Sequence, residues 1–292
     1  MSRAITTGSH SLSVESGSRP ERRFESTPRL PLLCELGSDL VHTTTWQRRT
    51  ALVRPFLLVT LFALLSLLGW WWLAPIVVFL VFIAVVTATH DVVHGSLGLT
   101  PRQTEFWLFA LGALLLESGH AYRLTHHQHH RVFPGPDDPE GDPARMSFWQ
   151  AVLWGPCFLP RLWWWAWCRS EAQRSQRRWL LLEALWAGGM ILLAVALSPL
   201  TVAPLMYFGL AVVGSWVYPL LTVHLPHHGY GETPLSQTGT LRGVVIPRLF
   251  LELTYHLEHH LYPQVPSHHL AELSRRLEPT LRAAGVVPRS VL

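Results

Sequence analysis

The chain has 292 residues, of which 49% are hydrophobic, only 14% are charged and 14 are tryptophan. Since about one quarter of the residues of a typical soluble domain are charged, this composition excludes an ordinary soluble protein and indicates a membrane protein. The formal net charge of +4 comes from arginine, because the sequence contains no lysine, and arginines that face anionic lipid account for it without a nucleic-acid partner.

Residues 1–45 are rich in serine, threonine, arginine and proline, and they lack the apolar core of a signal peptide. Such a composition is typical of segments that do not fold on their own. We therefore expect three parts: a mobile cytoplasmic tail over residues 1–45, a membrane domain over residues 46–275 and a C-terminal tail over residues 276–292.

Four apolar stretches are each near the ~20 residues that cross a bilayer as a helix. The first two are joined by a tryptophan-rich turn, which suits the membrane interface, and the last two by an uncharged connection. The sequence thus predicts an all-α integral membrane fold with four transmembrane helices in two hairpins. The predicted spans are Leu52–Leu73, Ala74–Val93, Trp179–Leu197 and Pro204–Val223.

Two further apolar stretches are not expected to cross the membrane. Phe106–Leu116 is too short to span and is expected to be re-entrant or to lie in the interface. Phe148–Trp167 is expected to be interrupted by Pro156 and Pro160, and its tryptophans indicate an interfacial helix. Both segments are therefore predicted to lie at the membrane surface.

The distribution of arginine predicts the topology. Arginines lie before the first predicted span, between residues 161 and 178 before the third, and at Arg242 and Arg248 after the fourth, whereas the two turns within the hairpins have none. Positive residues favour the cytoplasmic side. We therefore expect a multi-pass protein whose termini and histidine clusters, described next, are all cytoplasmic, with residues 225–292 forming a lobe over the clusters.

Three histidine clusters have helical spacing. Residues three or four positions apart lie on one face of a helix, so each cluster can direct two or three imidazoles to a common point. Imidazole suits iron, zinc and copper, and eight such ligands are too many for one four-coordinate zinc but suitable for two octahedral ions. The pattern predicts a di-metal centre, with two Fe ions as the expected case. The eight candidates are His90, His94, His126, His129, His130, His256, His259 and His260.

The remaining histidines divide into two sets. His127 points about 100° away from His126 on a helix, so it is left out. Three histidines follow the fourth span; His227 or His228 is favoured as a ninth donor, and His227 is the candidate ligand. Histidines without a partner set are expected to be hydrogen-bonded or at the surface. These are His120, His268 and His269.

Acidic residues near the clusters leave alternatives open. Asp91 can orient an imidazole or cap the next segment. Glu258 lies off the face of the third cluster and is expected to face solvent or to support a ligand. The loop over residues 134–143 is acidic and rich in proline and glycine; it can shape the rim of the site or receive a basic electron donor, and it can equally be a solvated turn.

The predicted metals indicate an oxidation that uses O2 as co-substrate. Two irons can jointly supply electrons to O2 for attack on an unactivated C–H bond, while the protein positions the substrate and excludes water. A site at the cytoplasmic ends of membrane helices is accessible to a lipid. The cysteines Cys34, Cys157 and Cys168 are scattered and form no iron–sulfur motif, so electrons must come from a separate donor.

The segments HDVVHG, HHQHH and YHLEHHLYPQVP resemble the three histidine boxes of the membrane fatty acid desaturase superfamily. The resemblance implies a di-iron enzyme with four membrane helices and a cytoplasmic cap that carries the histidine boxes, and electrons from a ferredoxin or cytochrome b5 type carrier. It also implies that the eight histidines are the ligands. In many acyl desaturases an asparagine holds a metal-bound water, and this chain contains no asparagine.

The branch of the superfamily stays open. The third box and its Leu-Tyr-Pro sequel fit fatty acyl desaturases, whereas HHRVFPGPDDPEGDP and Leu-Pro-His-His are similar to segments of carotenoid ring hydroxylases and ketolases. Acyl desaturation is the first expectation and carotenoid ring oxygenation the alternative. A transition-metal transporter is a distant third, because its ligands would lie within the spans, where this chain has little beyond Glu183.

Overall fold

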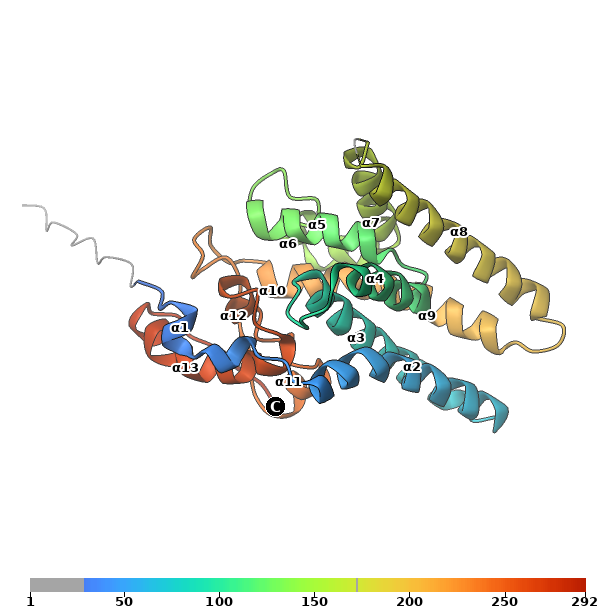
Figure 1. Ribbon diagram of the computed structural model, residues 1–292, viewed down its shortest axis with the longest axis horizontal. Coiled ribbons are helices and arrows are strands. Elements are labelled where there is room, and N and C mark those ends of the chain that lie inside the picture. The colour runs from blue at the N-terminus through green and yellow to red at the C-terminus, as the bar shows by residue number, and fades with distance from the viewer. Residues whose placement is uncertain (1–28, 172) are drawn as a thin grey trace, which may run out of the picture.

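The computed structural model describes residues 29–171 and 173–292, which form an all-α integral membrane fold (Figure 1). A two-stranded parallel pair, in which Leu241 lies opposite Arg289, is the only sheet in this described part. The elements in chain order are α1 (Leu33–Leu36), η1 (Ser38–Val41), α2 (Thr45–Leu67), η2 (Trp71–Leu73), α3 (Ala74–Val93), α4 (Pro101–Leu115), α5 (Gly119–Val132), α6 (Asp142–Arg145), α7 (Phe148–Arg169), α8 (Arg174–Leu197), α9 (Ala203–Pro219), η3 (Leu220–His224), α10 (Leu225–His227), β1 (Leu241–Arg242), α11 (Val245–Leu249), α12 (His256–Leu261), η4 (Ser267–His269), α13 (Leu270–Ala283) and β2 (Arg289–Ser290).

The prediction of four membrane-spanning helices is confirmed. The four candidate spans are Ser38–Leu67, Trp71–Val93, Arg174–Leu197 and Ala203–His227. They form two pairs, because α2 packs against α3 and α8 packs against α9. Each pair is joined by a short connection, which is the arrangement of two hairpins.

Two of the spanning helices, α3 and α8, differ in burial. Every residue of α3 from Val81 to Val93 is buried, because α3 packs against α2, α4 and α9. In contrast α8 buries four residues and exposes leucines such as Leu185 and Leu192, which suits contact with lipid. The carboxyl end of α3 therefore brings its histidines into the interior of the molecule.

Helix α7 corrects one expectation. It runs without a break from Phe148 to Arg169 and contains both Pro156 and Pro160, which were predicted to interrupt it. A proline costs a helix one backbone hydrogen bond, and packing can offset that loss. Here α7 packs closely on α9: at Gly155 a Cβ would collide with the backbone of Trp216.

The carboxyl-terminal lobe forms a cap at one end of the molecule, where α1, α11, α12 and α13 gather (Figure 1). Helix α13 is amphipathic and its buried face contacts Leu257 of α12 and Leu40 of η1. The residues of that face recur at helical spacing and are all fully buried: Leu270, Leu273, Leu277 and Leu281. The cap thereby fixes α12, which carries the third histidine cluster.

The predicted tails fall partly within this cap. Residues 1–28 lie outside the described residues, whereas residues 33–41 form α1 and η1 and pack on the cap through Leu40, which is fully buried. Helix α13 crosses residue 275, where the C-terminal tail was predicted to begin. In both places, apolar side chains that lie far apart in the sequence pack into one hydrophobic core.

Candidate metal centre

Four helical segments deliver the histidines. His90 lies in the last turn of α3, and His94 follows as its C-cap residue, with its backbone N–H donating to the carbonyl of His90. Helix α5 begins at Ser118, whose side chain accepts a hydrogen bond from the N–H of Ala121, and it presents the second cluster two turns later. The short helix α12 carries the third cluster and begins at Tyr255.

The fourth segment explains the choice among the histidines after α9. The chain passes through the π-helical η3 before α10 begins, and a π turn contains one more residue per hydrogen-bonded ring than an α turn. The change of register directs His227 toward the other clusters. His224 and His228 turn the other way, and their Nδ1 atoms lie 2.9 and 3.0 Å from the carbonyl oxygens of Pro143 and Ala144.

The nine candidate histidines converge in two adjoining groups. The first group takes members from α3, α5 and α12, and the second from α5, α10 and α12; within each group the nitrogens lie within 4.8 Å of one another. His256 adjoins the second group through His227 and His260. The groups are His90, His94, His126, His130 and His259, and His129, His227 and His260.

Within the first group, and between His256 and the second group, Nε2 atoms face each other. Two imidazole nitrogens at hydrogen-bond distance repel unless a proton or a cation lies between them, because each carries a lone pair when unprotonated. Three such contacts join members of the first group, and two join His256 to the second group. The Nε2–Nε2 distances are 2.9 Å for His90–His259, 2.9 Å for His130–His259, 3.2 Å for His126–His130, 3.0 Å for His227–His256 and 3.1 Å for His256–His260.

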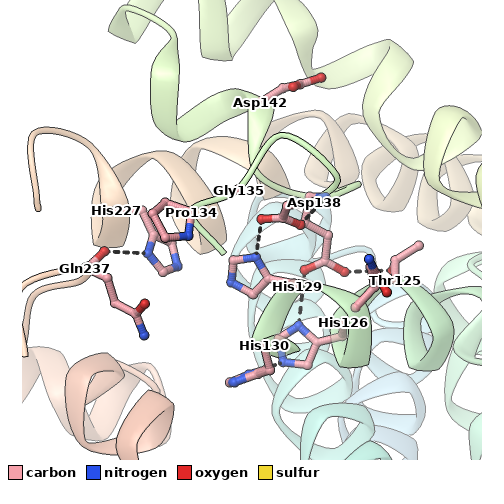
Figure 2. Close-up of polar contacts among 12 residues, drawn as sticks. Thr125, His126, His129, His130, Pro134, Gly135, Asp138, Asp142, His227 and Gln237 are labelled. Carbon is pink, nitrogen blue, oxygen red and sulfur yellow. Dashed lines mark hydrogen bonds and ion pairs between the residues drawn. The ribbon is translucent and has the colours of Figure 1, made fainter. Parts of the chain in front are cut away.

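Acceptors behind the rings set the direction of the imidazoles (Figure 2). The Nδ1 of His129 lies 2.8 Å from a carboxylate oxygen of Asp138, and that of His227 lies 3.1 Å from the carbonyl oxygen of Gln237. The Nδ1 of His126 lies 3.1 Å from a carboxylate oxygen of Glu140. An Nδ1–H that donates outward leaves the Nε2 lone pair pointing inward, as in histidines that bind metals.

The acidic loop after α5 supplies these carboxylates. Asp138 and Glu140 are buried, and the backbone N–H of Glu140 donates to Asp138 while the hydroxyl of Thr125 donates to Glu140. Burial raises the pKa of Glu140 to about 7. Of the alternatives for residues 134–143, the loop thus shapes the site, with Asp137 on its exposed side.

Electrostatics keep most of the imidazoles neutral. Burial, with nearby histidines adding to it, lowers the pKa of six of them: His94, His126, His130, His256, His259 and His260. Burial also opposes charge on His129, but the hydrogen bond and the charge of Asp138 outweigh it and raise the pKa of His129. A neutral imidazole is the form that binds a metal.

The donor set fits metal ions. The side chains are neutral nitrogen donors, and the Nε2 of His94 is buried without a hydrogen-bond partner among the described residues. Cations between the Nε2 atoms would relieve both this unpaired atom and the repulsion between facing lone pairs. The structure thus brings all nine predicted side chains together, and their role as ligands stays a prediction.

Three neighbours of the clusters are placed by the fold. Asp91 accepts hydrogen bonds from the N–H and the hydroxyl of Ser267, at 2.9 and 2.7 Å, and so it ties α3 to the cap rather than capping the next segment. Glu258 is fully buried, which excludes the solvent-facing alternative, and it accepts from Ser274 and Arg242. His127 bonds the carbonyl of Val93 and belongs to neither group, although its ring centroid lies 6.0 Å from that of His94.

Of the histidines without a predicted partner set, His120 and His269 are hydrogen-bonded, whereas the Nε2 of His268 is buried without a partner among the described residues. His120 is fully buried, with its Nδ1 2.7 Å from Glu183 and its Nε2 3.0 Å from Glu105. His269 contacts the amide of Gln47. The sequence did not indicate Glu117, a buried carboxyl in the turn between α4 and α5, because a lone glutamate after an apolar run has no periodic signal.

A family model described as "Fatty acid desaturase" matches residues 69–291. The matched segment contains all nine histidines of the two groups. No curated protein matches the chain.

Proposed function

The chain belongs to the fatty acid desaturase family, and from this premise we propose that it is an O2-dependent di-iron oxidoreductase that introduces a double bond into a fatty acyl chain. Membership supports a membrane oxidoreductase of lipid metabolism in general. The observation that carries the finer proposal is the convergence of nine imidazoles, five of them buried and four half-buried, with carboxylates behind the rings of His126 and His129.

The two groups of histidines would hold the two irons. One ion would be held by the group that takes its members from α3, α5 and α12, and the other by the group with His227, which His256 adjoins. When bound, two irons supply the electrons that activate O2 for cleavage of an unreactive C–H bond. The donor set is neutral, so its positive charge would come from the ions themselves.

The chain's own side chains orient this set and keep water away. Asp138 and Glu140 hold His129 and His126 in one tautomer, which is the support that metal-binding histidines commonly have. Tyr122 stacks on His126 with ring centroids 4.7 Å apart and covers it on one side. The hydrogen bonds of Ser267 to Asp91 close the cap over the end of α3.

Substrate and electrons reach the site by different routes in this proposal. The lipid comes from the bilayer, because the clusters lie at the ends of spanning helices. Electrons would come from a ferredoxin or cytochrome b5 type protein on the cytoplasmic side, the side that the distribution of arginine favours for the termini and the clusters.

One feature favours a second candidate, a carotenoid ring hydroxylase or ketolase. The acidic loop with Asp138 and Glu140 packs directly behind the second cluster, and its sequence is similar to that of the carotenoid-modifying branch. Both activities begin with removal of a hydrogen from carbon, and they differ in whether a second hydrogen leaves or oxygen is inserted. The products therefore distinguish them.

The deciding experiment expresses the chain in a host that makes β-carotene and profiles pigments and fatty acids together. New double bonds in acyl chains with unchanged pigment support the desaturase. Hydroxylated or keto pigment supports the second candidate and overturns the first. A His129→Ala strain serves as the matched control, since a product that persists in it comes from the host.

A further inference from the structure

A cavity of about 490 Å³ lies beside the histidines. It extends between α3, α7, α8, α9 and the turn from α4 to α5. Thr89 lines it directly before His90, and so does Tyr122, whose ring stacks on His126. Ile191 of α8 and Trp216 of α9 also line it and are 45% and 42% exposed, so the cavity reaches the lipid-facing surface of the spans.

Three buried polar atoms in this lining have no hydrogen-bond partner within the part of the chain that the structure describes. They are the hydroxyl of Thr89, one carboxyl oxygen of Glu117 and the indole N–H of Trp163. The other carboxyl group of the cavity, that of Glu183, is bonded to Ser118 and His120. Buried polar groups are nearly always paired, so unpaired ones that face a cavity point to a ligand with polar atoms.

The position of Glu117 is fixed by its backbone. Its N–H donates to the carbonyl of Gly112, and Leu116 before it adopts the left-handed conformation that ends α4. At Gly112 a Cβ would collide with the carbonyl of Glu117, and at Gly119 it would collide with the backbone of Leu108. The turn is therefore packed too closely to move Glu117 away from the cavity.

We propose that this cavity binds a lipid that carries a neutral hydroxyl or carbonyl oxygen, and that Glu117 hydrogen-bonds this oxygen while apolar carbons of the lipid lie against Tyr122, whose ring stacks on His126. The identification of the reacting carbon rests on the proposed function, whereas the binding of the oxygen does not. Glu117 is thus a specificity residue that selects an oxygenated lipid over a plain hydrocarbon chain.

The charge state of Glu117 agrees with a neutral partner. Burial raises the pKa of its carboxyl to about 8, so the group is mostly protonated at neutral pH and can donate its O–H. A carboxylate head group placed here would bring a charge into an apolar cavity at high cost. The indole N–H of Trp163 is a second donor toward the same space.

The test measures binding, with the full chain in phosphatidylcholine nanodiscs. The probes are octadecane, stearyl alcohol and a mid-chain ketone of equal length, and mass spectrometry quantifies the lipid retained relative to empty nanodiscs. We expect the alcohol and the ketone to be retained about ten-fold more than octadecane, which is the discrimination that one buried hydrogen bond supplies. Glu117→Leu abolishes this preference and Glu117→Gln retains it.

The matched control is Glu171→Leu, which changes an exposed glutamate outside the cavity and leaves the preference intact. If the wild-type chain retains octadecane as well as the oxygenated probes, the proposal is overturned, whether or not the variants fold. Infrared spectroscopy of an isotope-labelled ketone provides a second test. The carbonyl band shifts on binding to the wild type, and it does not shift if Glu117 makes no hydrogen bond. If the chain prefers the oxygenated probes but converts no lipid, the proposed oxidoreductase activity is wrong, whereas the binding proposal is supported.

Discussion

Helix α5 takes part in two buried networks of histidine and carboxylate that differ in one respect. Near its start, His120 has both ring nitrogens bonded to carboxylates, those of Glu183 and Glu105, and the ring stacks on Trp179. Near its end, His129 bonds a carboxylate on its outer side only. The inner nitrogens there face other histidines, not carboxylates.

The difference shows what distinguishes a metal centre from a structural network. Burial and carboxylate partners are common to both, so neither identifies a ligand. A structural histidine uses both nitrogens within the protein, whereas a candidate ligand uses one and leaves the other directed at a shared point. If this distinction holds, removal of an inner nitrogen reduces the bound metal, whereas removal of a structural imidazole reduces the stability of the protein.

The largest effect is expected for removal of one inner nitrogen. His129→Ala or His259→Ala abolishes turnover and lowers bound iron, because each ring belongs to one of the two groups. Metal analysis of purified protein and a product assay measure the result. His269→Ala is the matched control, since that ring contacts the amide of Gln47 and belongs to neither group. Full iron content and activity in both ligand variants would remove the basis of the assignment.

A smaller loss is expected when the outer support is weakened. Asp138→Asn or Glu140→Gln keeps the shape but weakens the acceptor behind His129 or His126, and such changes cost roughly 10–100-fold in metal affinity or activity. Iron affinity by competition with a chelator provides the measurement. Asp137→Asn is the control, because that neighbouring side chain is exposed. Equal loss in the control would mean that the loop, not the hydrogen bond, matters.

Disruption of the network around His120 should lower the stability of the protein and leave its metal content unchanged. His120→Ala leaves the buried Glu183 without its imidazole partner, and an unpaired buried group costs about 1–3 kcal/mol. Thermal unfolding in detergent should occur at a lower temperature, while iron per folded protein stays at the wild-type level. Loss of iron from protein that is still folded would contradict the comparison, because His120 would then act on the metals.

Periodicity made the spans and eight of the nine histidines predictable from sequence. Spacings of three and four place side chains on one helix face whatever the rest of the chain does, and a run of about 20 apolar residues has few alternatives to a membrane helix. The choice between His227 and His228 could not be made in this way. It depends on the π turn of η3, which no local pattern indicates.

Contacts between distant segments could not be predicted from the sequence, for a different reason. Asp91 bonds Ser267, which lies 176 positions away, and Glu258 becomes buried only because α13 and Arg242 cover it. The continuity of α7 through two prolines likewise depends on its packing against α9. Such outcomes require the docked cap and the packed helices, which composition and spacing do not describe.

The smallest effect is expected for a contact of the cap that lies outside both networks. Arg276 of α13 donates to Asp39 and to the carbonyl of Leu36, and it also bonds Glu272. Arg276→Ala should therefore speed hydrogen exchange of residues 33–41, by no more than about five-fold because exposed ion pairs are weak. Iron content and turnover should not change, since none of these groups touches the histidines.

The same contact predicts a dependence on pH with a defined sign. Hydrogen bonds from Arg275 and Arg276 lower the pKa of Glu272 to about 2, below its ordinary value, so the stabilisation is present at neutral pH and is lost as the pH falls toward 2. Exchange of residues 33–41 should accelerate on acidification in the wild type more than in Arg276→Ala, after correction for intrinsic exchange. Arg275→Ala is the matched control, because Arg275 bonds Glu272 within the same helix and does not reach residues 33–41. If the two variants exchange alike, Leu40 and the apolar core of the cap hold this segment without help from Arg276.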